Sequence, residues 1–327
     1  MRIFVAGATG ALGRQLLPRL TERGHEVTGM TRTDSKAALI EELGAAPAVA
    51  DALDAEQVAR AVAEADPEVI VHEMTALSGG IDMRHPDRAF ETTNRLRTEG
   101  TDHLLAAGRA VGIDRFVAQS FTGWPYERTG GPIKDEDAPL DPHPLSSMRK
   151  TFDAIRYLER TVSGAEWTTG VVLRYGGFYG PGTSLWTGGE HLEPILQRKF
   201  PVVGNGEGIW SLIHIEDAAT ATVAAIEHDK RGIYNVVDDE PARVREWLPK
   251  LAEMLGAPPP RRVPKWVGRL FAGKPGVIMM TEMRGASNAK AKRELSWEPR
   301  YPSWREGFKL LARKQASSTG RGVEVTA

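Results

Sequence analysis

The sequence contains no cysteine in its 327 residues. The chain therefore forms no disulfide, offers no thiolate nucleophile and binds no cysteine-ligated zinc. It also has no apolar run long enough to span a bilayer, and glycine interrupts the first apolar stretch at Gly7, too early for a secretory signal. These absences favour a cytoplasmic protein that does not enter the membrane.

The sequence also has no excess of positive or negative charge, because its formal net charge is only −1. The sequence therefore has no electrostatic footprint for nucleic acid or for an anionic membrane, and we expect neither as a partner. The eight histidines show no metal-ligand spacing, so we expect no metal. A hydrophobic content of 41% with 26% charged residues is ordinary for a globular enzyme that acts on a small molecule.

The most informative segment of the chain is 2–14, where a short apolar strand runs directly into glycines spaced G-x-x-G-x-x-G. Gly7 suits a tight turn, Gly10 lets a pyrophosphate approach bare backbone, and Gly13 allows close packing of the following helix. A Walker phosphate loop is excluded, because Arg14 follows the last glycine in place of lysine. The residues expected to hold a dinucleotide here are Gly7, Thr9, Gly10, Ala11, Leu12 and Gly13.

Alternating strands and helices follow this turn. We expect strands at 3–6, 26–30, 48–50, 68–72, 114–120, 168–174, 209–213 and 233–237, and helices at 36–43, 54–65, 87–111, 146–162, 193–198, 216–227 and 244–255. Such alternation predicts an α/β fold, a doubly wound Rossmann sheet of parallel strands. We assign 1–175, completed by 209–237, to this domain, 176–208 and 238–315 to a substrate lobe, and 316–327 to a disordered tail.

Several motifs together resemble the extended short-chain dehydrogenase/reductase family of epimerases, dehydratases and reductases. They are the glycine turn, Asp51-Ala52-Leu53-Asp54, Asn94, the segment 173–182 with Leu-Arg-Tyr and Tyr-Gly-Pro, His214-Ile215-Glu216-Asp217, and Tyr234-Asn235-Val236. The resemblance implies a nicotinamide cofactor, with Asp51 and Ala52 at the adenine and Thr75 and Ala76 along the wall after the fourth strand. An N-cap role for Asp51 or Asp54 is an equal alternative. The resemblance also implies a homodimer through the helices at 87–111 and 146–162.

The choice of cofactor depends on charge after the second strand. Arg32 follows that strand directly, so its guanidinium can bind a 2′-phosphate, with Lys36 as a further donor. We therefore predict NADP(H). In the alternative, both cations are solvated and Asp34 binds the ribose of NAD, but Asp34 lies several residues beyond the strand end.

One feature departs from the family pattern. Members carry Tyr-x-x-x-Lys on the helix before the sixth strand, and here these two positions fall on Thr151 and Ile155. A second register with Ser146 and Lys150 lies too far from Glu159. The usual serine or threonine after the fifth strand falls near Phe121. The expected acid is thus missing.

Two interpretations follow, a divergent NADPH-dependent carbonyl reductase and a catalytically silent NADP(H) sensor. A sugar-nucleotide-type epimerase or dehydratase would need a base that the sequence does not place. Aromatic residues on loops expected near the cofactor favour a large aromatic substrate, although core packing is the alternative for each: Trp124, Tyr126, Tyr179, Trp186 and Trp210. The candidate catalytic residues of a ketoreductase are Thr122, Tyr126, Tyr179 and His214.

Overall fold

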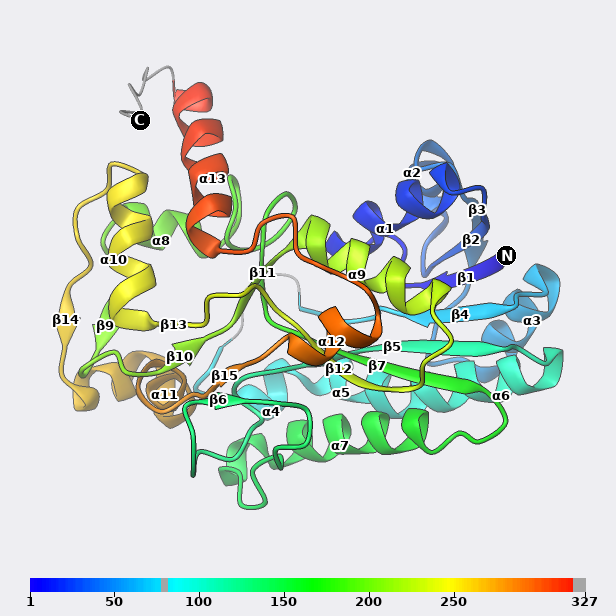
Figure 1. Cartoon of the computed structure of the whole chain (residues 1–327), viewed down its shortest axis with the longest axis horizontal. Helices are drawn as coiled ribbons and strands as arrows, with labels where there is room; N and C mark the ends of the chain where they lie inside the picture. Colours follow the sequence, from blue (N-terminus) through cyan, green and yellow to red (C-terminus); the bar gives the residue numbers. More distant parts are fainter. Residues whose placement is uncertain (78–81, 320–327) are drawn as a thin grey trace.

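The computed structural model describes residues 1–77 and 82–319. Within these residues, seven parallel strands form one central sheet in the order β12-β7-β5-β4-β1-β2-β3 (Figure 1). The strands are β1 (Arg2–Ala6), β2 (Glu26–Thr31), β3 (Ala46–Val49), β4 (Val69–His72), β5 (Arg115–Phe121), β7 (Thr169–Tyr175) and β12 (Gly232–Val236). The Rossmann sheet predicted from the alternation of elements is confirmed.

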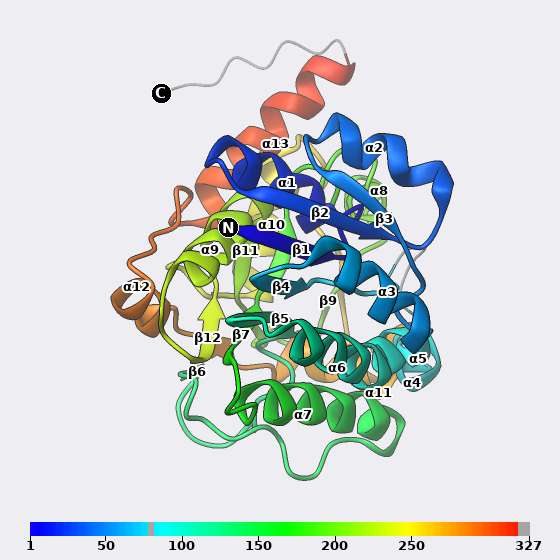
Figure 2. The same ribbon diagram turned by 90° about the vertical axis from the view of Figure 1, so that its right-hand side faces the viewer.

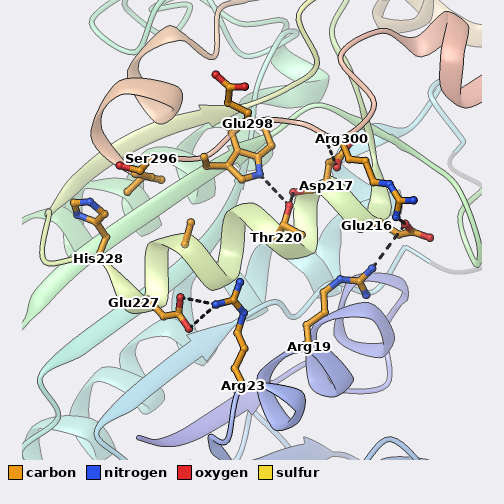
Figure 3. Close-up of a pocket in the computed structure, with 13 residues that line it drawn as sticks. Arg19, Arg23, Glu216, Asp217, Thr220, Glu227, His228, Ser296, Glu298 and Arg300 are labelled. Atoms are coloured by element: carbon orange, nitrogen blue, oxygen red, sulfur yellow. Dashed lines mark hydrogen bonds and ion pairs between the residues drawn. The ribbon is translucent and has the colours of Figure 1, made fainter.

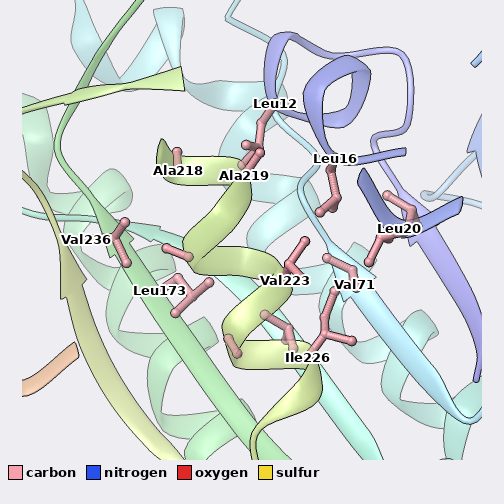
Figure 4. Packing of buried hydrophobic residues seen from close by; sticks show 14 of the residues in the cluster. Leu12, Leu16, Leu20, Val71, Leu173, Ala218, Ala219, Val223, Ile226 and Val236 are labelled. Carbon is pink, nitrogen blue, oxygen red and sulfur yellow. The ribbon is translucent and has the colours of Figure 1, made fainter. Parts of the chain in front are cut away.

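Helices cover both faces of the sheet, which is why its strands are almost continuously apolar. One face packs against α1 (Ala11–Glu22) and α9 (Ile215–Glu227), and the other against α3 (Ala55–Ala65), α6 (Thr101–Val111) and α7 (Arg149–Ser163) (Figure 2). In Figure 4, Leu16 and Leu20 of α1 and Val223 and Ile226 of α9 meet above Val71 of β4. Because helices cover both faces of the sheet, a ligand is expected at the carboxyl ends of the strands.

A long helical stretch lies within 87–111, as the sequence predicted, but it is not a regular α-helix throughout. It consists of α4 (Pro86–Ala89), α5 (Glu91–Arg95), a π-helical turn at Leu96–Gly100 and then α6. The π turn accommodates one additional residue per turn, which apolar periodicity does not reveal. The helix predicted at 36–43 is α2 (Ala37–Glu42), which follows a 3-10 turn at Asp34–Lys36, and α7 follows another such turn at Ser146–Met148.

Paired short strands and helices of the later segments form a lobe beside the sheet. Its core is aromatic, with Trp247, Trp304 and Phe308 all buried. The strand pairs are β6 (Ile133–Lys134) with β15 (Gly285–Ala286), β8 (Gly177–Tyr179) with β11 (Leu212–His214), β9 (Val202–Val203) with β14 (Arg262–Val263), and β10 (Ile209–Trp210) with β13 (Ala242–Arg243). The helices are α8 (Leu192–Leu196), α10 (Val244–Met254), α11 (Lys265–Thr281), α12 (Ala289–Glu294) and α13 (Trp304–Thr319).

The expected division of the chain needs two adjustments. Of the segment 209–237, α9 and β12 join the Rossmann domain, whereas 209–214 forms β10 and β11 in the small strand pairs of the lobe. The predicted tail begins too early, since α13 extends to Thr319, and 320–327 lie outside the described residues. In the described part of the chain, no helix has the length and apolar character needed to cross a membrane.

Candidate functional site

The glycine turn connects β1 to the N-terminus of α1. Gly7 has φ +97°, and a Cβ there would lie 2.6 Å from the carbonyl oxygen of Glu73. Gly13 is also closed to any side chain, because a Cβ would collide with the carbonyl of Ala8. Gly10, by contrast, is exposed, and a Cβ on it would meet only the carbonyl of Gly7 at 3.2 Å. The exposed backbone therefore lies at the start of α1, where unpaired N–H groups and the helix dipole suit a pyrophosphate.

Arg32 lies at the carboxyl end of β2, as predicted. The side chains of Arg32 and Lys36 are both exposed, and neither forms a hydrogen bond or an ion pair with the described residues. Asp34 lies between them and begins the 3-10 turn that Lys36 ends. Two free cations thus lie beside the β1–β2 edge, where an adenosine ribose binds in this fold.

The remaining cofactor candidates surround the ends of β3 and β4. Asp51 accepts the N–H of Leu53 at 3.0 Å, and Asp54 caps α3 by accepting two backbone N–H groups. The N-cap alternative therefore holds for Asp54, while Asp51 closes a turn. The other three candidates are Ala52, which is buried, and Thr75 and Ala76, which are exposed beyond β4.

Thr122 and Tyr126 meet at the carboxyl end of β5. Both donate to the same acceptor, the Oδ1 atom of Asn235, at 3.1 and 2.7 Å. Both side chains are buried, and burial raises the pKa of the Tyr126 phenol. Arg174 donates to the Tyr126 hydroxyl at 3.1 Å and forms a bidentate pair with Glu159 at 2.7 and 2.8 Å. In this arrangement the Tyr126 phenol is a fixed member of a buried network.

Tyr179 and His214 form a second buried pair, in the lobe. Their rings lie edge to face at 5.2 Å. His214 caps α9 by accepting the N–H of Glu216 at its Nδ1, which leaves the proton of the neutral ring on Nε2. Burial lowers the pKa of His214 to about 4. Neither the Tyr179 hydroxyl nor the His214 Nε2 has a partner in the described residues, and both rings pack into the lobe core with Trp186.

The position of the usual tyrosine is occupied by Thr151, in the first turn of α7. Thr151 is 0% exposed; its hydroxyl donates to Asp87 at 3.2 Å and accepts from Asn94 at 3.1 Å. Ile155, at the usual lysine position, is also buried. At these two positions the helix therefore provides neither a phenol nor an ammonium group.

An aromatic cluster lies beside Thr151. Trp124 is within 6.2 Å of the rings of Phe90, Phe121 and Phe152, and it is only half-buried, as is Phe121. The cluster gives this end of β5 an apolar aromatic wall. Trp186 and Trp210 instead pack with the lobe core, against His214 and Trp247 respectively.

A concave region lies between α1, α9 and the segment 295–300 (Figure 3). Its arginines already have partners, since Arg23 pairs with Glu227 at 3.1 Å and Arg19 with Glu216 at 3.8 Å. Nothing in its lining provides redox chemistry. Across the described residues, no group of three or more His, Asp or Glu side chains is placed to hold a metal ion.

Sequence reasoning missed Glu73, which directly follows β4. It is 5% exposed, and its Oε1 accepts a hydrogen bond from the Tyr175 hydroxyl at 3.1 Å. Burial raises the pKa of this carboxyl to about 8. A signal was present, because Glu73 is an acidic residue directly after a strand, at the carboxyl edge of the predicted sheet.

The sequence profile of the NAD dependent epimerase/dehydratase family matches residues 3–237. The chain belongs to this family. The resemblance indicated by the glycine turn and the later motifs is thereby confirmed, and the family's description supports a nicotinamide dinucleotide as the cofactor.

Relatives within the NAD dependent epimerase/dehydratase family include named reductases. A 3-diazoavenalumate denitrifying reductase of a Streptomyces species is 44% identical over 311 residues, covering 94% of this chain and 99% of the relative. A 4-hydroxy-2-methyl-3-oxo-4-farnesyl-3,4-dihydroquinoline-1-oxide ketoreductase of Stigmatella aurantiaca is 29% identical, covering 78% and 74%. This chain is accordingly an oxidoreductase, a reductase of a small molecule.

Solved structures in this family share the fold. The UDP-glucose 4-epimerase of Thermotoga maritima, with UDP-glucose, superposes with a TM-score of 0.76 at 22% identity, covering 98% of this chain and 100% of the other. The epimerase of Thermus thermophilus, in complex with NAD, gives 0.74 at 23% identity, covering 97% and 100%. These likenesses establish the architecture and leave the substrate open.

Proposed function

We propose that this protein transfers a hydride from NADPH to a large aromatic substrate, at a centre that needs no proton from the protein. The observation that supports this most is Thr151, whose hydroxyl is buried and held between Asp87 and Asn94 where a family member carries its acidic tyrosine. The four candidate catalytic residues are buried as well, so none of them is exposed as a general acid.

An aromatic diazonium group is the electrophile that fits this chemistry best. Hydride addition to the carbon that carries a diazonium group forms a C–H bond, while the C–N bond breaks and its electron pair leaves with dinitrogen. Atoms and charge balance without a proton donor. The 44% identical relative is named for the denitrifying reduction of a diazo acid, which supports the same reaction class here.

The cofactor choice follows from the free cations beside β2. Arg32 offers a planar fork for a 2′-phosphate, and Lys36 adds a second positive charge in the adjoining turn. NADPH, when bound, would supply the hydride. The protein's part is to hold it at the glycine turn and orient it over the carboxyl ends of the strands, and proximity of this kind contributes effective molarities of about 10⁵ M or more.

The aromatic cluster supports the substrate class. Phe121 replaces a polar residue at the end of β5, and it joins Trp124, Phe90 and Phe152 in one wall beside Thr151. Such a wall favours a planar conjugated molecule and offers nothing for the hydroxyl groups of a sugar.

Carbonyl reduction is the second candidate. It is favoured by relatives named as a ketoreductase and as a 2-alkyl-3-oxoalkanoate reductase, at 29% and 28% identity. That reaction needs a proton on the product oxygen, which would come from water or from Tyr126, Tyr179 or His214. Thr122 would donate a hydrogen bond to the same oxygen. A missing general acid costs about 10²–10⁴-fold, which good positioning can offset.

The two reactions are separated by one assay. NADPH oxidation is followed with an aromatic diazo acid and with a panel of aromatic ketones, each against a reaction without enzyme, and dinitrogen release and deuterium transfer from 4-deuterated NADPH are measured by mass spectrometry. We expect dinitrogen and one deuterium on carbon. Reduction of ketones alone would replace the first candidate with the second, and tight NADPH binding without any reduction would favour the sensor.

The same assay tests the four predicted donors in the variants Thr122→Val, Tyr126→Phe, Tyr179→Phe and His214→Ala. If diazo reduction needs no acid, each variant that folds keeps its turnover. Loss of turnover in a single folded variant would identify a donor and contradict the proposal.

A further inference from the structure

Glu73 lies in direct contact with the turn that receives the cofactor. Its backbone N–H donates to the carbonyl of Ala6 at 2.8 Å, and its own carbonyl blocks any side chain on Gly7. Its side chain is 5% exposed. A carboxyl group is thus buried immediately beneath the first glycine of the phosphate turn.

Around this carboxyl there are polar groups but no charges. From β7, the Tyr175 hydroxyl donates to Oε1 at 3.1 Å and lies 2.7 Å from the Thr222 hydroxyl of α9. Oε2 is buried and has no hydrogen-bond partner in the described residues. The carboxyl is therefore easier to keep neutral than ionised, and burial raises its pKa to about 8.

Other buried groups near the carboxyl edge titrate elsewhere. His72, the preceding residue, bonds to the carbonyl of Leu96, and burial lowers its pKa to about 4. Arg97, close to His72, has its pKa lowered to about 10, again by burial. Of these three groups, Glu73 is therefore the one whose charge changes between pH 7 and 9.

The sheet order places Glu73 under one half of the cofactor. A dinucleotide crosses the edge with its pyrophosphate at the β1–α1 turn, and the adenosine half lies over β2 and β3. The nicotinamide half then extends over β4, β5 and β7. Glu73 ends β4 and is bonded to Tyr175, the last residue of β7.

We infer that Glu73 makes the relative affinity of the protein for oxidised and reduced cofactor depend on pH. This inference rests on the proposed cofactor site. Both oxidation states carry the same phosphates, and they differ by the positive charge of the oxidised ring. A neutral Glu73 carboxyl does not stabilise the positive charge of the oxidised nicotinamide ring, whereas an ionised carboxylate does. Binding of the oxidised form then favours release of the Glu73 proton to solvent, and binding of the reduced form does not.

The test is the ratio of dissociation constants for NADP⁺ and NADPH, measured by titration calorimetry between pH 6.5 and 9. We expect this ratio to fall about tenfold as the pH rises across this range. A tenfold change corresponds to a difference of one unit in the Glu73 pKa between the two complexes. Glu73→Gln removes the titration and should flatten the curve, and Glu73→Leu provides a second neutral variant if Gln destabilises the fold.

A matched control is Asp238→Asn. Asp238 is another buried carboxyl with an unpartnered oxygen and a pKa raised by burial, but it lies in the lobe after β12. This variant should keep the wild-type curve. A flat curve in the wild type, or the same slope in Glu73→Gln, overturns the inference. Because no substrate is used, a wrong assignment of the reaction leaves the test valid, and failure to bind either cofactor refutes the proposed function instead.

Discussion

The Nδ2 atom of Asn94 donates a hydrogen bond to the Thr151 hydroxyl at 3.1 Å, joining α5 to the first turn of α7. The same hydroxyl donates to Asp87. The helix position that supplies the acid in related enzymes is used here to tie three helices together. A structural role for Thr151 is thus visible in its contacts.

Thr151→Val should lower stability and leave turnover close to the wild-type value. The change leaves the buried amide of Asn94 without its acceptor and Asp87 without a donor. We expect it to lower the free energy of unfolding by about 1–3 kcal/mol. Urea unfolding and steady-state NADPH oxidation measure the two effects. Thr101→Val, another buried threonine whose hydroxyl bonds within its own helix, is the control. Loss of turnover in folded Thr151→Val would show that this hydroxyl takes part in the chemistry.

Arg32→Ala should weaken NADPH binding and leave NADH binding unchanged. A charge-assisted hydrogen bond contributes about 1.5–3 kcal/mol, which corresponds to a loss of roughly tenfold to hundredfold in affinity. Calorimetric titration with each cofactor checks this. Arg60→Ala, on the exposed side of α3, should change neither affinity. Equal wild-type affinities for the two cofactors would support Asp34 as the ribose ligand of an NAD enzyme.

Two glycines of the turn should respond in opposite ways. Gly10 has φ −70° and ψ 172°, which any residue adopts, so Gly10→Val leaves the fold intact and fails only because its branch fills the pyrophosphate space. Gly7→Ala combines φ +97° with a contact of 2.6 Å and should destabilise the domain by about 1–3 kcal/mol. Circular dichroism and cofactor titration separate the effects. Tight NADPH binding by Gly10→Val would mean that the phosphate site lies elsewhere.

Local signals made most of the fold predictable. The run from β1 through Gly7, Gly10 and Gly13 into α1 is contiguous, and so is the step from β2 to Arg32. The strands of the sheet are apolar because helices cover both faces, and this pattern appears in any short window of sequence. The sequence did not predict the π turn before α6, because this turn changes the helix geometry without changing the apolar face of the helix.

The site itself depends on partners that lie far apart in the chain. Tyr126 and Asn235 are 109 residues apart, and Tyr175 and Glu73 are 102 apart. No window of sequence shows such pairs. Trp186 was expected near the cofactor and instead packs into the lobe core, since an aromatic side chain on a loop can turn either way. Only the fold decides this.

The stability of the protein should fall as pH rises from 6.5 to 8, because of Glu73. Its pKa is about 8 in the folded protein and ordinarily 4.5 for glutamate, so between these values the folded state holds a proton that the unfolded state has lost. The free energy of unfolding therefore decreases by about 1.4 kcal/mol per pH unit for this group. His72 and His214 act with the opposite sign and at lower pH, since burial lowers the pKa of each from 6.5 to about 4.

Urea unfolding at pH 6.5, 7.0, 7.5 and 8.0 should show this slope in the wild type and in the surface control Glu282→Gln, and a flatter line in Glu73→Gln. Parallel lines for the wild type and Glu73→Gln would mean that the carboxyl is already ionised in the folded protein, with a partner at Oε2.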